Sequence, residues 1–118
     1  MILSLGVAFS VAASAQDFPS KAVRFITGAA PGSSGDVLAR VLGDAVSETW
    51  KQPVVIENRP GGGGAISSQA VLSAPPDGHT VFIAAGSYLT ITPATTANLP
   101  YDVDRDFTPL AFLAEIPL

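Results

Sequence analysis

Two glycine-rich turns constrain this chain more than any other feature, because each lies between an apolar, strand-like run and a helix-like run. The first covers residues 30–36 (Ala-Pro-Gly-Ser-Ser-Gly-Asp) and the second residues 58–64 (Asn-Arg-Pro-Gly-Gly-Gly-Gly). A strand–turn–helix unit directs several backbone N–H groups at one point, at the positive end of a helix dipole. Two such units predict paired anion-binding loops at the carboxyl edge of a parallel sheet.

The runs around these turns predict an α/β fold. Strands are expected over residues 22–27, 54–58 and 80–85, and the third is apolar enough to be buried on both faces. Helices are expected over residues 36–51, with Ser33 or Ser34 as the N-cap, and over residues 65–73, with Ile66, Ala70 and Val71 inward. The apolar stripe of the first helix comprises Val37, Leu38, Val41, Leu42, Ala45 and Val46. Short loops imply right-handed βαβ crossovers and a parallel sheet, with a fourth strand beginning at residues 110–114.

Residues 1–15 are uncharged, apolar or small, and end in Ala13-Ser14-Ala15. This pattern predicts a secretory signal peptide cleaved after Ala15. The basic n-region of such signals is missing, and a start codon assigned too far downstream would explain its absence. A membrane anchor needs about 20 apolar residues, and Gln16-Asp17 interrupts the run earlier. The predicted mature chain therefore begins at residue 16.

Composition and motifs exclude several classes of function. The chain has no cysteine and a net charge of −4, with its 6 Lys and Arg residues scattered, so we expect no thiolate metal site and no nucleic-acid partner. No Gly-Lys pair occurs, which excludes a P-loop. The dinucleotide fingerprint fails because Ile66 or Ser67 stands where its third glycine belongs. A nucleophile elbow fails because Asp36 replaces its last glycine.

Candidates for catalysis or metal binding are equally few. His79 is the only histidine and is interpreted as a structural imidazole at the edge of a turn. Asp102, Asp104 and Asp106 alternate as in a calcium loop, but the required glycine and distal glutamate are missing, which favours a solvated acidic turn. The sequence therefore predicts no catalytic residue, no metal and no cofactor.

The glycines have a structural alternative, since they can simply provide positive φ for tight connections. Four in succession favour close approach of a ligand to the main chain. Ser33, Ser34 and Ser87 add hydroxyl groups, which can equally cap helices. Arg59 can meet an anion or form a salt bridge with Glu57 or Asp36.

An ordered series of short motifs, beginning at Phe18, carries a family resemblance. It comprises residues 18–21 (Phe-Pro-Ser-Lys), 30–40, 52–61, 76–80 (Pro-Asp-Gly-His-Thr), 99–102 (Leu-Pro-Tyr-Asp) and 106–107 (Asp-Phe). In order and spacing the chain resembles the extracytoplasmic solute receptors of tripartite tricarboxylate transporters, the Bug (TctC-like) family. It departs from the family pattern at Ser33, where a second glycine is usual, and at residues 65–67.

The resemblance implies a non-enzymatic, periplasmic binding protein of the type II-like class, whose two α/β lobes close on a small carboxylate. Residues 16–118 would form the N-terminal part of the first lobe, and the partners would be the membrane components of the transporter. The ligand-binding residues implied are Ala30, Pro31, Gly32, Ser33, Ser34, Gly61, Gly62, Gly63, Gly64, Ala65, Gly86 and Ser87. The alternatives are an α/β enzyme domain that uses the same turns for a phosphorylated substrate, and a truncated product that does not fold.

Overall fold

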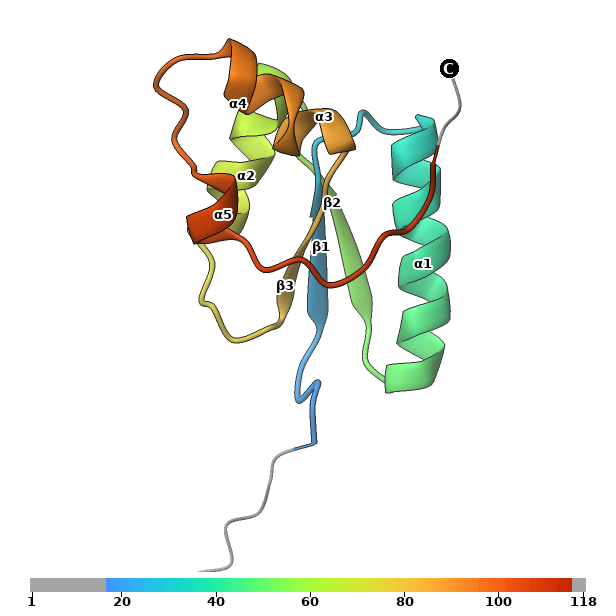
Figure 1. The fold of residues 1–118 in the computed structure, drawn as a ribbon. Helices are drawn as coiled ribbons and strands as arrows, with labels where there is room; N and C mark the ends of the chain where they lie inside the picture. Colours follow the sequence, from blue (N-terminus) through green and yellow to red (C-terminus); the bar gives the residue numbers. More distant parts are fainter. Residues whose placement is uncertain (1–16, 116–118) are drawn as a thin grey trace, which may run out of the picture.

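A three-stranded parallel sheet forms the centre of the computed structural model, which describes residues 17–115 (Figure 1). The strands are β1 (Val23–Thr27), β2 (Val54–Asn58) and β3 (Thr80–Ile83), in the order β2-β1-β3. Val and Ile are frequent in all three, and β-branched side chains suit a pleated surface. The predicted parallel α/β architecture is confirmed.

Two crossovers connect the strands. Helix α1 (Ser34–Trp50) joins β1 to β2, while the single turn η1 (Gly62–Gly64) and helix α2 (Ala65–Leu72) join β2 to β3. Because the crossovers step across the sheet in opposite directions, right-handed connections place α1 and α2 on opposite faces, as Figure 1 shows. The carboxyl ends of β1 and β3 thus form the topological switch point, where open α/β sheets bind ligands.

Helix α1 buries a narrower face than its apolar periodicity predicts. Ala39 and Gly43 are buried against the sheet, while Val37 and Val41 are 53% and 62% exposed. The packing is tight at Gly43, where a Cβ would lie 3.0 Å from Cδ1 of Ile56. The predicted single stripe was therefore wrong in part: the helix touches the sheet along its small residues, and one side of the stripe faces outward.

The second crossover also differs in which residues it buries. Ser67 and Ser68 of α2 are fully buried, and Ile66, expected inward, is 51% exposed. Strand β3 is two residues shorter than predicted, and its side chains are mostly half-buried, with only Ile83 buried. The expectation of burial on both faces was wrong because β3 is an edge strand of the sheet that residues 17–115 form.

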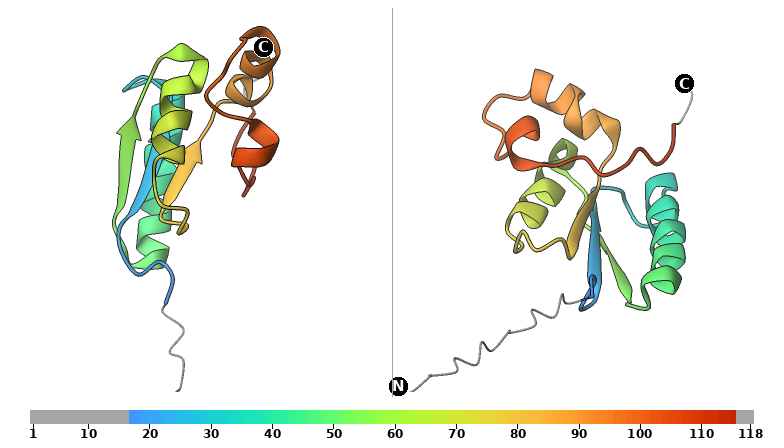
Figure 2. Two further views of the ribbon diagram at one scale, coloured as in Figure 1. Left: turned by 90° about the vertical axis from the view of Figure 1, so that its left-hand side faces the viewer. Right: turned by 60° about the horizontal axis from the view of Figure 1, so that its bottom comes forward.

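Three short helices follow β3 and lie on its side of the sheet (Figure 2): α3 (Gly86–Leu89), α4 (Ile91–Thr95) and α5 (Val103–Asp106). Residues 107–115 are extended, but they pair with no strand of the described chain, so the strand predicted over residues 110–114 is not formed. A strand requires a hydrogen-bonded neighbour. Without one, Leu110 and Phe112 are 78% and 81% exposed.

The hydrophobic core lies between α1 and the sheet. Val23, Phe25, Ala39 and Ile83 form its buried cluster, and Trp50, the last residue of α1, packs against it. Burying a side chain such as Phe25 contributes roughly 1.5–3 kcal/mol. Within residues 17–115 no helix has the length and apolar character needed to cross a membrane.

Candidate functional site

The carboxyl ends of the three strands lie side by side and bring the predicted turns to one edge. Thr27, the last residue of β1, is in register with Asn58 of β2 on one side and with Ile83 of β3 on the other. The turn after each strand leads directly into a helix (Figure 1). The structure thus brings the predicted site residues to one edge of the sheet.

The turn after β1 satisfies part of its own backbone. Gly32 has φ +81° and donates its N–H to Oδ2 of Asp36 at 2.8 Å. The N–H and the hydroxyl of Ser33 both donate to the carbonyl of Ala30, at 3.1 and 2.7 Å, so Ser33 holds the N-cap position without capping through its side chain. These two N–H groups are therefore already engaged.

The outward donors of this turn belong to the start of α1. The first helical bond runs from the N–H of Val37 to the carbonyl of Ser33. The N–H groups of Ser34, Gly35 and Asp36 precede that bond, and such N–H groups point out of the helix end. They are at the positive end of the dipole of a 17-residue helix.

Asp36 and Asn58 connect this turn to the end of β2. The buried carboxylate of Asp36 accepts from Nδ2 of Asn58 at 2.8 Å and from Nε of Arg40 at 3.1 Å, as well as from Gly32. Asn58 Nδ2 also donates to the carbonyl of Ala29 at 3.0 Å. The hydrogen bonds from Arg40, then Gly32 and Asn58, lower the pKa of Asp36 to about 2.

The four-glycine turn has a conformation that other residues rarely adopt. All of Gly61, Gly62, Gly63 and Gly64 have positive φ, between 59° and 120°. The N–H of Gly64 donates to the carbonyl of Gly61, and that of Ala65 donates to the carbonyl of Gly62. The N–H groups of Gly62 and Gly63 precede these bonds, so they are the donors that the turn can offer to a ligand.

The turn after β3 opens helix α3. Gly86 and Ser87 are exposed, and the N–H of Tyr88 makes the first bond of that helix, to the carbonyl of Ala85. No heavy atom lies within 4 Å of a Cβ built on Gly86, so this glycine leaves open space at the edge of the sheet.

Tyr88 contacts the other two turns, a contact that sequence reasoning missed. Its hydroxyl donates to the carbonyl of Gly28 at 3.1 Å, and a Cβ on Gly28 would lie 2.6 Å from Cε2 of the ring. A Cβ on Gly64 would overlap the same ring. At Gly28 and Gly64 the lack of a side chain therefore makes room for Tyr88.

The three arginines nearest these turns are each paired with a carboxylate. Arg24 makes a bidentate contact with Glu57 at 2.6 and 2.9 Å, and Arg59 reaches the same carboxylate at 3.3 Å, one of the two partners expected for it. Arg40 pairs with Asp36. Three arginines thus share two carboxylates and leave one net positive charge, and the other positive groups at this edge are backbone N–H groups.

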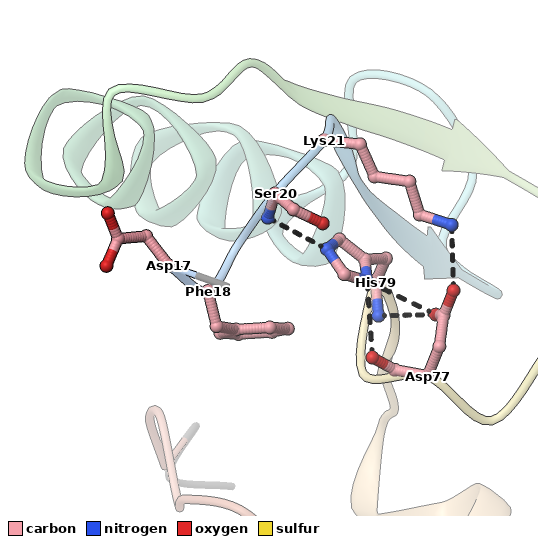
Figure 3. Close-up of a pocket in the computed structure, with 6 residues that line it drawn as sticks. All are labelled: Asp17, Phe18, Ser20, Lys21, Asp77 and His79. Carbon is pink, nitrogen blue, oxygen red and sulfur yellow. Dashed lines mark hydrogen bonds and ion pairs between the residues drawn. The ribbon is translucent and has the colours of Figure 1, made fainter. Parts of the chain in front are cut away.

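A shallow pocket at the opposite end of the sheet contains His79 (Figure 3). The imidazole is buried, lies with its centroid 4.9 Å from that of the Phe18 ring at a tilt of 57°, and accepts from the N–H of Ser20 at Nε2. Because a backbone N–H can only donate, Nδ1 carries the proton and donates to the carbonyl of Asp77 at 3.2 Å. The histidine has a structural role, buried more deeply than a turn-edge position predicts.

The alternating aspartates form a helix start. Asp102 caps α5 by accepting from the N–H of Arg105, and Asp106 accepts from the N–H of Asp102 and pairs with Arg105. Across residues 17–115 no group of three or more His, Asp or Glu side chains is placed to hold a metal ion.

Comparison with known proteins identifies the family. The model of the tripartite tricarboxylate transporter family receptor matches residues 38–118. A UPF0065 protein of Bordetella bronchiseptica is 43% identical over 91% of this chain and 32% of its own length. BugT of Bordetella pertussis is 34% identical over 99% of this chain and 36% of its own length. The chain thus spans about a third of the length of these relatives.

Solved structures agree in fold. A periplasmic transporter superposes with a TM-score of 0.75 and 43% identity, covering 80% of this chain and 32% of its own. MatC from Rhodopseudomonas palustris, solved with bound malate, superposes with a TM-score of 0.76 and 35% identity, covering 81% of this chain and 33% of its own. The family comprises solute-binding receptors, not enzymes, which removes the support for the enzyme alternative. The chain belongs to the tripartite tricarboxylate transporter receptor family, as its sequence motifs predict.

Proposed function

We propose that this chain is part of a solute-binding receptor that holds a small carboxylate through backbone N–H groups at the carboxyl edge of its sheet. The single observation that carries the proposal is the convergence of three helix-opening turns on that edge, next to Thr27, Asn58 and Ile83. Helix N-termini bind anions without basic side chains.

The donors proposed for the ligand come from both glycine-rich turns. Ser34 supplies the N–H at the start of α1, and Gly62 and Gly63 supply those before η1 closes. The pairing of Arg24, Arg40 and Arg59 with carboxylates supports recognition by the main chain rather than by a free cation. The remaining proposed contacts are Ala30, Pro31, Gly32, Ser33, Gly61, Gly64, Ala65, Gly86 and Ser87.

The ligand class is a di- or tricarboxylate. The solved MatC relative holds malate, whose two carboxylates match a site built from two sets of N–H donors. By its family, the receptor would work in the periplasm with the membrane components of a tripartite tricarboxylate transporter. The leader would be residues 1–15, which lie outside the described part of the chain, and residues 16–118 would belong to the first of two lobes.

A thermal-shift series on the receptor that carries these residues tests the proposal. Malate, citrate, aspartate and glutamate are compared with glycerol phosphate at equal concentration. We expect at least one carboxylate to raise the Tm at sub-millimolar concentration, because binding to the native state alone stabilises it by mass action. A shift with glycerol phosphate and none with the carboxylates would support the phosphate-binding alternative instead.

A further inference from the structure

Tyr88 lies between two turns that are more than thirty residues apart in the sequence. Its hydroxyl donates to the carbonyl of Gly28, directly after β1, at 3.1 Å. Its ring also fills the space beside Gly64, the last residue of the four-glycine turn, where any Cβ would overlap it. One side chain therefore contacts the turn after β1 and the turn after β2 at the same time.

The position of Tyr88 is itself fixed from two directions. Its N–H donates to the carbonyl of Ala85 at 3.0 Å, and its carbonyl accepts from the hydroxyl of Tyr101 at 2.7 Å. Tyr101 is only 6% exposed. In the next helix, the hydroxyl of Thr92 donates to the carbonyl of Gly63 at 3.0 Å, a second contact from this segment to the glycine turn.

The four-glycine turn needs such support. Glycine gains more conformational freedom in unfolded or loosened states than any other residue, and four in succession have a large ordering cost. Loop donors that are already ordered before binding give higher affinity than donors that the ligand must order. The contacts from Tyr88 and Thr92 restrict the turn from outside, where glycine has no side chain to restrict itself.

We propose that Tyr88 is a positioning residue, which sets the separation between the β1 turn and the Gly61–Gly64 turn and so allows their N–H groups to act on one ligand. This inference rests on the proposed function, because it takes the ligand held by the two turns to be the carboxylate proposed above. The ring acts as a rigid spacer, and its hydroxyl fixes that spacer to the β1 turn. A side chain at Gly28 or at Gly64 would overlap this spacer, and Gly64 also has a positive φ that favours glycine.

Amide hydrogen exchange of the receptor without ligand tests the spacer directly. In Tyr88→Phe the ring remains, but the bond to Gly28 is lost, and we expect exchange in both turns to quicken about fivefold, as loss of one hydrogen bond predicts. Thr95→Val is the matched control, since it removes one hydroxyl bond from the same segment, to the carbonyl of Ile91, and that bond involves neither Tyr88 nor the two turns. We expect it to change exchange in the two turns less than about twofold.

Binding to malate, measured by calorimetry on the same variants, provides the second readout. We expect Tyr88→Phe to raise the Kd about fivefold, with Thr95→Val within about twofold of the unsubstituted receptor. A purely structural role would lower the Tm of both variants and leave both Kd values unchanged. That result, or unchanged exchange in the turns of Tyr88→Phe, would overturn the proposal.

A second substitution separates the ring from the hydroxyl. Tyr88→Phe removes only the bond to Gly28, while Tyr88→Ala also empties the space beside Gly64 that the ring fills. We expect Tyr88→Ala to quicken exchange in the four-glycine turn beyond the effect of Tyr88→Phe; equal exchange in the two variants would overturn the proposal. If malate fails to bind the unsubstituted receptor, the proposed ligand class fails, while the exchange data still decide the role of Tyr88.

Discussion

The carboxylate of Asp36 accepts a hydrogen bond of 2.8 Å from the side-chain amide of Asn58. Asp36 is in the first turn of α1, and Asn58 is the last residue of β2, so the pair connects the turn after β1 to the neighbouring strand. Both amide hydrogens of Asn58 are used, one by Asp36 and one by the carbonyl of Ala29. The contact fixes the β1 turn to the edge of the sheet before any ligand arrives.

Replacing Asp36 by Asn should destabilise the receptor strongly for so small a change. An amide has one acceptor and one donor group, so its NH2 must face either Asn58 Nδ2 or the N–H of Gly32, both of which are donors. We expect the Tm to fall by about 5–10 °C. Asp44→Asn, on an exposed position of the same helix, is the control and should shift the Tm by no more than about 1 °C.

Acid should remove the contribution of Asp36. Its folded pKa of about 2 is below the ordinary value of about 3.9, so the unfolded chain takes up the proton first as the pH falls. The stabilisation is complete above about pH 4 and is lost towards pH 2. The difference in Tm between the unsubstituted receptor and Asp36→Asn should therefore narrow over that range. A difference that stays constant down to pH 2 would contradict the assignment.

Glycine substitutions should weaken carboxylate binding more than loss of the nearby arginine. Gly32 and Gly62 have φ of +81° and +59°, and a β-branched residue is strained there whatever the space around it. We expect Gly32→Val and Gly62→Val to raise the Kd about tenfold or more, and Arg59→Ala, which is half-exposed and paired with Glu57, about twofold or less. Calorimetry showing the reverse order would refute recognition by the main chain.

Export should remove the first fifteen residues. The uncharged apolar stretch ending in Ala13-Ser14-Ala15 predicts cleavage between Ala15 and Gln16. N-terminal sequencing of the receptor recovered from the periplasm should therefore begin at Gln16. Recovery of a chain that begins at Met1 would contradict the predicted export.

Residues 16–118 alone should bind no carboxylate with useful affinity. A two-lobe receptor holds its ligand between the lobes, and closure removes competing water from the N–H groups. The exposed side chains of Leu110 and Phe112, together with the open edge of β3, should also make the isolated segment poorly soluble. A cooperative thermal transition that rises on addition of sub-millimolar malate or citrate would show that the short chain is a working receptor.

The sequence predicts the order of elements well, because each signal for it is local. Apolar runs and glycine turns place β1, α1, β2, α2 and β3 to within two residues of the structure. Which side of a helix is buried is not local. Val37 is exposed and Ser67 is buried because burial depends on the neighbour that a face meets, not on the residue's own polarity.

The candidate site also has features that are local in the sequence and features that are not. The glycine-rich turns could be found from composition, while the residues that hold them could not, since Tyr88 lies 60 residues beyond Gly28 in the sequence. Asn58 carried a weak signal, because asparagine is uncommon in strands and this one both ends β2 and begins the second turn. The contribution of Tyr88 follows only from the parallel register, which brings the three strand ends together.

The sharing of the single carboxylate of Glu57 by Arg24 and Arg59 has a consequence for how quickly a ligand arrives. Two guanidinium groups on one carboxylate leave one positive charge beside the four-glycine turn, and the N–H dipoles of the turns act over only a few ångströms. A dicarboxylate is therefore steered to this edge by a single net charge, whose field salt screens beyond about 10 Å at 0.1 M. Added salt should lower the association rate only slightly, much less than at a site lined by several free arginines.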